Sequence, residues 1–263
     1  MKLPGKSIRI VYMVFLLLLV VLPLVIVLYY AFTDEVGHFT AENFLLFFTN
    51  QRTLGTLFYS LVIAVITTLF SLALAYPTAY ILSQNMVKNP ELILMMLIAS
   101  MWINSVLRLT ALKEILSFLE GNIAFFPFLN TILAMTYDFL PFMILPIYNS
   151  LTQIEPSLLE AARDLGAKPA EVLLRVVVPL SMPGVLSGIT MVFLPAMTNY
   201  VVLDMMYNGT FIMGSLIGSY FNSYDWHNGS MISSVLLLLI FAFTMADRKK
   251  SEKKPVQKEG VEA

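Results

Sequence analysis

The sequence predicts an all-α membrane protein with six transmembrane helices and both termini in the cytosol. Of its 263 residues, 58% are hydrophobic and 13% are charged. The mean hydropathy of +0.80 lies well beyond that of a soluble domain. A helix needs roughly 20 apolar residues to cross the hydrocarbon core of a bilayer. Six stretches meet this requirement, at residues 8–32, 54–82, 92–112, 128–151, 184–206 and 231–246.

The distribution of basic residues predicts the orientation of these segments. With both termini inside, thirteen lysines and arginines fall on the cytosolic side and three on the outer side. The thirteen are Lys2, Lys6, Arg9, Lys88, Arg163, Lys168, Arg175, Arg248, Lys249, Lys250, Lys253, Lys254 and Lys258. The three are Arg52, Arg108 and Lys113. Such an excess of positive charge is typical of cytosolic loops, so the polar loop at 155–181 is predicted to face the cytosol.

The N-terminal and C-terminal parts of the chain are assigned by length and composition. The first segment follows basic residues as a signal peptide would, but its apolar run is too long and no small-residue cleavage site follows it. We therefore expect a retained span.

The next loop contains FTAENFLLFF (39–48), which predicts a short interfacial helix. The charged tail 247–263 is predicted to be disordered and cytosolic. Its basic run can contact anionic membrane lipid, although topology explains it equally well. Residues 1–246 form the predicted transmembrane domain.

The third and fourth segments carry ionisable residues at membrane depth, Arg108 and Asp138. A central aspartate costs about 2.5–3.5 kcal/mol on insertion scales, so Asp138 is expected to face protein or water. Thr131, Asp138 and Asn149 recur at separations close to whole helical turns, which predicts a polar stripe on one face. For Asp138, an interhelical hydrogen bond and a place on a transport pathway are both open.

The fifth segment has Asp204 near its outer end, with Tyr200 one turn before it. Thr190, Met197 and Asp204 are expected to share one helix face because they recur every seven residues. An acid beside an aromatic ring offers an organic cation a charge partner and a cation–π surface. The alternative is a solvated aspartate at a helix end, paired with Arg108. Arg108 can also extend outward or neutralise either acid.

Residues 155–181, EPSLLEAARDLGAKPAEVLLRVVVPLS, form a polar island between the fourth and fifth segments. Pro156 suits a first helical position, where its missing N–H is not needed. Gly166 suits the left-handed residue that ends a helix, and Pro169 can open a second helix. A short, charged helical pair in the cytosol is typical of a docking surface. An ordinary amphipathic hairpin without a partner is the alternative.

The island also carries a family pattern. Glu160-Ala161-Ala162, three residues, Gly166, nine residues and Val176-Val177-Val178-Pro179 resemble the EAA loop of ABC-importer permeases, which ends in Ile-x-Leu-Pro. The resemblance implies a type I ABC-importer permease architecture and a loop that seats in a groove of a cytosolic ATPase. Small alanines permit close approach, and the charged residues can pair with partner charges. The coupling residues implied are Glu160, Ala161, Ala162, Arg163, Asp164 and Gly166.

Three further stretches narrow the resemblance. MWINSVLRLTALKEIL, YDFLPFMILPIYNSL and VFLPAMTNYVVLDMM are similar to the third, fourth and fifth spans of PotB-type polyamine permeases, and the likeness covers residues 40–246. It implies a bacterial cytoplasmic-membrane subunit that translocates spermidine and putrescine. The partners implied are a PotC-type second permease, an ATPase dimer that holds ATP and Mg, and an external polyamine-binding protein. It also supports an acid at Asp204, whereas Asp138 rests on the physical argument alone. Related permeases for sulfate, iron or thiamine leave the substrate open.

Two other classes are less consistent with the sequence. The chain has no cysteine, His38 and His227 lie far apart in predicted outer loops where we expect them exposed, and no P-loop is present. An intramembrane enzyme would lack its reactive groups, and ATP hydrolysis needs another chain. No cofactor or nucleic acid is expected on this one. An ion-coupled secondary transporter would also have buried acids, but it has no use for the EAA-like loop. An uncoupler that stops uptake while ATP remains would identify it.

Overall fold

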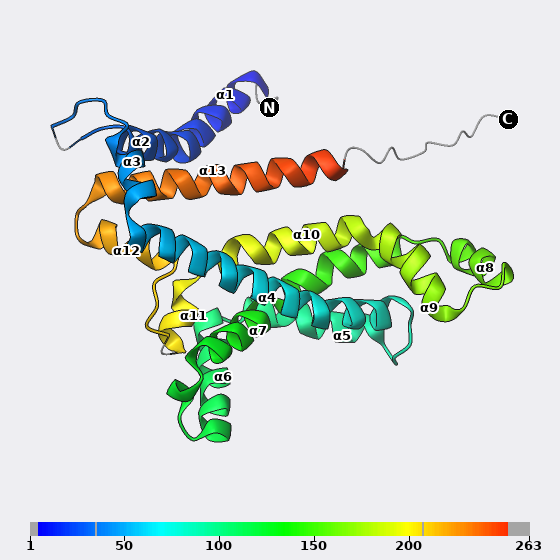
Figure 1. Ribbon diagram of the computed structural model, residues 1–263. Helices are drawn as coiled ribbons and strands as arrows, with labels where there is room; N and C mark the ends of the chain where they lie inside the picture. The colour runs from blue at the N-terminus through cyan, green and yellow to red at the C-terminus, as the bar shows by residue number, and fades with distance from the viewer. Residues whose placement is uncertain (1–4, 35, 207, 252–263) are drawn as a thin grey trace. The chain divides into compact units, whose positions relative to one another are not determined.

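The computed structural model describes residues 5–34, 36–206 and 208–251, and the described chain is built from helices (Figure 1). Within these ranges the β structure consists of one isolated antiparallel bridge, between Thr33 and Phe39. The chain divides into two compact units, Met1–Phe58 with Met213–Ala242 and Tyr59–Ile212 with Phe243–Ala263. The all-α class is confirmed.

The first unit contains the N-terminal span. Its helices are α1 (Gly5–Leu16), a π-helical turn (Leu17–Val21), α2 (Leu22–Ala31), α3 (Glu42–Thr49), the first residues of α4 (Gln51–Ser83), α12 (Met213–Asn222) and α13 (Trp226–Ser251) up to residue 242. The predicted short helix at 39–48 is confirmed as α3. The amide of Asn43 donates to the carbonyl oxygens of Ala31 and Thr33, at 3.2 and 3.0 Å, and so ties α3 to the end of α2.

The second unit contains most of the remaining helices. They are the rest of α4, α5 (Pro90–Ala99), α6 (Ser105–Glu120), α7 (Pro127–Thr152), α8 (Pro156–Asp164), α9 (Pro169–Val172), α10 (Val178–Ala196), α11 (Tyr200–Met205) and the end of α13 from residue 243, with a π-helix at Leu173–Val177. Two 3-10 turns, Ser100–Trp102 and Ile123–Phe125, complete the set. α7 packs along α10, and α8 and α9 lie at one end of this pair (Figure 1).

Length and composition define four helices that can cross a membrane, or five if a bent pair is one span. They are Arg9–Ala31, Gln51–Ser83, Pro127–Thr152, Pro169–Ala196 and the bent pair Pro90–Trp102 with Ser105–Glu120. The apolar part of α13, Trp226–Ala242, is shorter. The sixth span and the cytosolic position of both termini therefore stay predictions.

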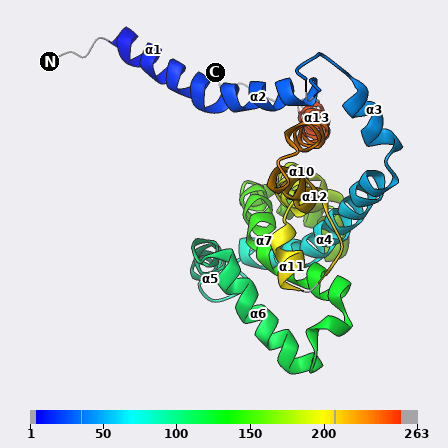
Figure 2. The ribbon, with the colours of Figure 1, turned by 90° about the vertical axis from the view of Figure 1, so that its left-hand side faces the viewer.

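The third predicted span is not one helix, and its expected course from 92 to 112 is wrong. The chain breaks after Trp102, and α5 and α6 meet at 104°, so that Figure 2 shows α5 nearly end-on and α6 running across the view. Ile103 is extended, and the side chain of Asn104 accepts a 2.8 Å hydrogen bond from the Val106 amide. Asn104 thus acts as an N-cap, a local signal that stops one helix and starts another.

The fifth predicted span, 184–206, has different ends in the structure. The continuous helix runs from Pro169 to Ala196, and α11 follows separately. At the break, the amides of Thr198 and Asn199 both donate to the Pro195 carbonyl oxygen, which closes the helix as a tight turn. The seven-residue spacing predicted that Thr190, Met197 and Asp204 share one face of a single helix. Because the helix ends at Ala196, this prediction is wrong.

The predictions for the tail and the histidines have mixed outcomes. α13 continues to Ser251, so residues 247–251 of the predicted disordered tail are helical; its remainder, 252–263, lies outside the described residues. His38 is 78% exposed, as expected. His227 is half-buried and its Nδ1 lies 3.1 Å from the Tyr30 carbonyl oxygen, so the prediction that it is exposed is wrong.

Candidate functional site

The polar island forms two helices joined by a closed turn. Pro156 opens α8, as predicted, and Gly166 follows its end with φ = 82°. The Gly166 amide donates to the Arg163 carbonyl at 2.8 Å, and the Ala167 amide donates to the Ala162 carbonyl at 3.2 Å. These two bonds form a Schellman motif, which needs a left-handed residue at the glycine position. The turn predicted at Gly166 is confirmed.

The second helix is capped and then merges into the membrane-spanning helix. Pro169 occupies the first turn of α9, and the Glu171 carboxylate accepts a 3.0 Å hydrogen bond from the Lys168 amide. After Val172 the chain passes through the π-helix Leu173–Val177 into α10 without a break. We call α8, α9 and the residues between them the α8–α9 hairpin. Since α7 ends just before it, any movement of the hairpin bears directly on α7 and α10.

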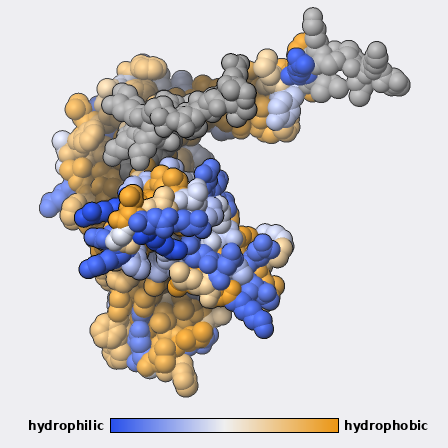
Figure 3. All heavy atoms as spheres, turned by 90° about the vertical axis from the view of Figure 1, so that its right-hand side faces the viewer, coloured by the Kyte–Doolittle hydropathy of each residue, from blue (hydrophilic) through white to orange (hydrophobic). Residues whose placement is uncertain are grey.

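The side chains of the hairpin are presented outward. Glu160, Ala161, Arg163, Asp164 and Gly166 are exposed and Ala162 is half-buried. Neither the Glu160 nor the Arg163 side chain has a hydrogen bond or ion pair with the described part of the chain. Figure 3, which faces the end of the molecule bearing α8 and α9, shows hydrophilic residues gathered there. Leu165, 89% exposed, adds an apolar side chain, so the hairpin offers both charge and apolar area to a partner.

The helices that carry the hairpin approach each other unusually closely. A Cβ on Gly184 would lie 2.5 Å from the Pro146 carbonyl oxygen, and one on Gly188 would lie 2.7 Å from Met143 Sδ. Gly184 and Gly188 form a G-x-x-x-G pair, the spacing that lets two membrane helices touch through their backbones. Sequence reasoning overlooked this pair, although its spacing is visible in GVLSG. Tyr76 of α4 adds a 3.0 Å hydrogen bond to Ser181 of α10.

Asp138 is paired inside the chain. Arg108 Nη2 lies 2.5 Å from Asp138 Oδ1, and both side chains are 7% exposed. The Arg108 guanidinium also lies 5.9 Å from the centre of the Tyr137 ring. The pair joins α6 to α7. Of the two acids that the sequence offered as partners for Arg108, the structure pairs it with Asp138 and not with Asp204. This geometry agrees with the interhelical reading of Asp138; a pathway role stays a prediction.

The three residues of the predicted polar stripe on α7, Thr131, Asp138 and Asn149, have different neighbours. Thr131 is fully buried and accepts a 3.1 Å hydrogen bond from the Asn208 amide, which also donates to Tyr59 Oη at 3.0 Å. Asp138 meets Arg108, and Asn149 is exposed and lines a groove beside α10. Asn208 thus joins α4 and α7 to the loop after α11. Nothing in the local sequence singles it out, since its partners lie 77 and 149 residues away.

Asp204 and Tyr200 lie together on a single short helix. Both belong to α11, one helical turn apart, and both are exposed in this chain. They therefore remain open to a ligand or to another subunit, as the predicted pathway role requires. No group of three or more potential metal ligands occurs within the described residues.

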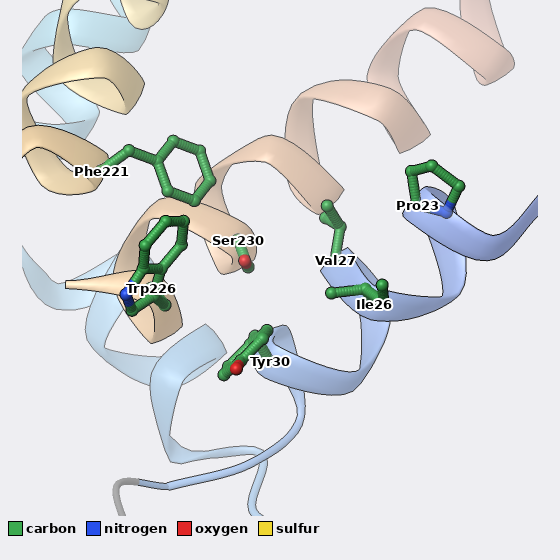
Figure 4. Close-up of a pocket in the computed structure, with 7 residues that line it drawn as sticks. All are labelled: Pro23, Ile26, Val27, Tyr30, Phe221, Trp226 and Ser230. Atoms are coloured by element: carbon green, nitrogen blue, oxygen red, sulfur yellow. The ribbon is translucent and has the colours of Figure 1, made fainter. Parts of the chain in front are cut away.

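The first unit contains a separate aromatic cavity of about 450 Å³. Pro23, Ile26, Val27 and Tyr30 of α2 face Phe221 of α12 and Trp226 and Ser230 of α13 (Figure 4). The lining is almost entirely apolar, and Trp226 lies against both Tyr30 and Phe221. Aromatic residues at the end of an apolar span are typical of the membrane interface, and the residues that line the cavity include no acidic or basic side chain.

Together, the long apolar helices define a multi-pass helical membrane protein, and the hairpin adds an outward-facing surface of charged and apolar side chains. The sequence profile of the family described as "Binding-protein-dependent transport system inner membrane component" matches residues 2–247. The chain belongs to this family of membrane permeases, which are transport subunits rather than enzymes.

Relatives and solved structures agree with this assignment. The chain is 36% identical over 200 residues to the spermidine/putrescine transport system permease protein PotB of Escherichia coli (strain K12), covering 70% of this chain and 73% of the relative. It is 33% identical over 264 residues to PotB of Haemophilus influenzae, covering 90% and 92%. A bacterial alginate ABC transporter, solved in complex with an alginate-bound periplasmic protein, shares the fold with a TM-score of 0.72 at 12% identity, covering 97% and 96%. A chain of the MetNI methionine ABC transporter shares the fold with a TM-score of 0.59 at 16% identity, covering 78% of this chain and 98% of that one.

Proposed function

We propose that the chain is the permease subunit of an ATP-driven importer that translocates polyamines, spermidine and putrescine among them. The observation that carries this proposal is the similarity to PotB permeases, which extends over 90% of the chain in the Haemophilus influenzae relative. The exposed carboxylate of Asp204 beside Tyr200 suits a polycation, since it supplies charge and an aromatic face.

ATP hydrolysis is assigned to a separate ATPase that docks on the α8–α9 hairpin. The side chains of Glu160 and Arg163 have no partners within the described chain, and Leu165 is almost fully exposed, so this surface is available to another protein. Closure of an ATPase dimer on ATP would displace the hairpin, and the close α7–α10 contact would carry the displacement into the membrane. Such coupling requires that the inward-open and outward-open states bind ATP or substrate differently.

The remaining partners follow from the family. Its description names a binding protein, and we propose one that delivers polyamine at the outer face of a bacterial cytoplasmic membrane. A second, PotC-type permease would complete the pathway, with ATP and Mg held by the ATPase. Six membrane spans with both termini in the cytosol complete this architecture.

Uptake of radiolabelled spermidine tests the proposal. Cells lacking the gene are compared with the same cells carrying it on a plasmid. We expect restored, ATP-dependent uptake that excess putrescine suppresses and that an uncoupler leaves intact while ATP is maintained. Equal uptake in both strains, with the partner subunits detected, would reject polyamine as the substrate. The same strains tested with thiamine, ferric iron and sulfate would then identify the alternative.

A further inference from the structure

A groove of about 360 Å³ runs between α7 and α10 on the side next to the α8–α9 hairpin. Its polar lining consists of Asn149 and Ser150 from α7, Gln153 just after the end of α7, and Ser187 from α10. The rest of its lining is apolar: Leu145, Pro146, Pro183, Gly184 and Met191. The groove therefore begins within the membrane span and opens where α7 ends, at the predicted cytosolic face.

The polar side chains of the groove lack partners. The side chains of Asn149, Ser150, Gln153 and Ser187 make no hydrogen bond with the described part of the chain. Polar groups on membrane-spanning helices are costly unless they meet water, protein or a ligand. The described residues that line the groove include none with a charge. They offer amide and hydroxyl oxygens, which accept hydrogen bonds from a cation without holding it as a carboxylate would.

The spacing of these acceptors fits an aliphatic polyamine. Asn149 and Gln153, the residue that caps the end of α7, are four residues apart, which corresponds to about 6 Å along the helix axis. Two ammonium groups separated by four methylenes span five bonds, also about 6 Å when extended. The apolar side chains of Leu145 and Met191 continue the lining beyond Asn149 and can contact a methylene segment there. The groove thus combines two acceptor side chains at the spacing of two ammonium groups with apolar side chains that follow them along the helix.

We propose that this groove binds the ammonium groups of the transported polyamine as it leaves the pathway toward the cytosol, an inference that rests on the proposed function. Because its acceptors are neutral, binding is weak and release is fast. Asp204 lies beyond the opposite end of α10 and carries a full charge. A cation moving from Asp204 to the groove therefore passes from a charged ligand to neutral ones, which favours its release.

The test uses the complete transporter, with its second permease and ATPase, in liposomes supplied with the binding protein and labelled spermidine. The double variant Asn149→Leu/Gln153→Leu is expected to lower the maximal uptake rate about tenfold. Its control, Thr152→Val, lies on the same helix end outside the groove and is expected to transport normally. The variant Asn149→Asp adds a carboxylate and is expected to lower both KM and maximal rate, because substrate is held longer at the exit.

The outcomes separate the groove from the proposed function. Absence of spermidine uptake by the unmodified transporter would overturn both. Normal uptake by the unmodified transporter and by the leucine double variant would overturn the groove alone. Loss of the second permease from the purified double variant would also overturn it, because the groove would then be a subunit interface. Lowered KM in Asn149→Asp, with the complex intact, would support the exit site.

Discussion

Gly184 of α10 lies so close to Pro146 of α7 that a Cβ at the glycine would come within 2.5 Å of the proline carbonyl oxygen. The two helices that flank the α8–α9 hairpin therefore touch through their backbones. We expect a pair in such close contact to move as one body, as the proposed transmission from a docked ATPase requires.

Replacing Gly184 by alanine tests this contact. The added methyl group must separate the helices or distort them, and overpacking of this kind costs about 1–3 kcal/mol. We expect a lower thermal unfolding midpoint for the purified protein and reduced uptake. Gly55→Ala is the matched control, because a Cβ there meets nothing within 4 Å. Equal destabilisation by both changes would show that the α7–α10 approach is not special.

Gly166→Val tests the turn of the hairpin. A left-handed residue with a side chain costs roughly 1–2 kcal/mol, and a β-branched one is the least tolerated. We expect the variant to reach the membrane but to lose spermidine uptake, while the ATPase still hydrolyses ATP. Asparagine tolerates the left-handed region, so Gly166→Asn should retain most uptake. Full uptake by the valine variant would count against the coupling role.

The Arg108–Asp138 pair predicts a specific pattern of stability. Removing one partner leaves a buried charge unpaired, at a cost of about 3–5 kcal/mol. Arg108→Met alone should therefore lower the unfolding midpoint sharply, whereas Arg108→Met/Asp138→Leu should recover most of it. If the recovered double variant also transports spermidine, the pair is structural. A stable double variant without uptake would instead assign Asp138 to the pathway.

Asp204→Asn should affect transport without affecting folding. The side chain is exposed, and substitutions at such positions usually change stability by less than about 0.5 kcal/mol. We expect the same amount of transporter in the membrane with a KM for spermidine raised several-fold, because the charge partner of the ammonium is lost. Uptake measured over a range of spermidine concentrations gives KM directly, and an unchanged KM would remove Asp204 from the pathway.

The sequence did not predict the two helix breaks, after Trp102 and after Ala196. Hydropathy predicted a helix through Asn104 and another through Met197, because apolar periodicity averages over many residues and is insensitive to a single cap. At Asn104 the side chain caps the start of a new helix, and at Pro195 the carbonyl oxygen accepts hydrogen bonds from two backbone amides. Both are local hydrogen bonds, and Asn104 could have been recognised as a helix-start residue within its segment.

The sequence by itself determined the membrane class, the family and the hairpin with its turn at Gly166. These depend on composition and on residues close together in the chain, where glycine and proline restrict the backbone directly. The tertiary structure decided which acid Arg108 meets, that Asn208 binds Thr131 and Tyr59, and that Gly184 touches Pro146. It also brought Asn149 and Ser187 to one groove. Each of these contacts joins residues far apart in sequence, and only the packing of helices against one another brings such residues within reach.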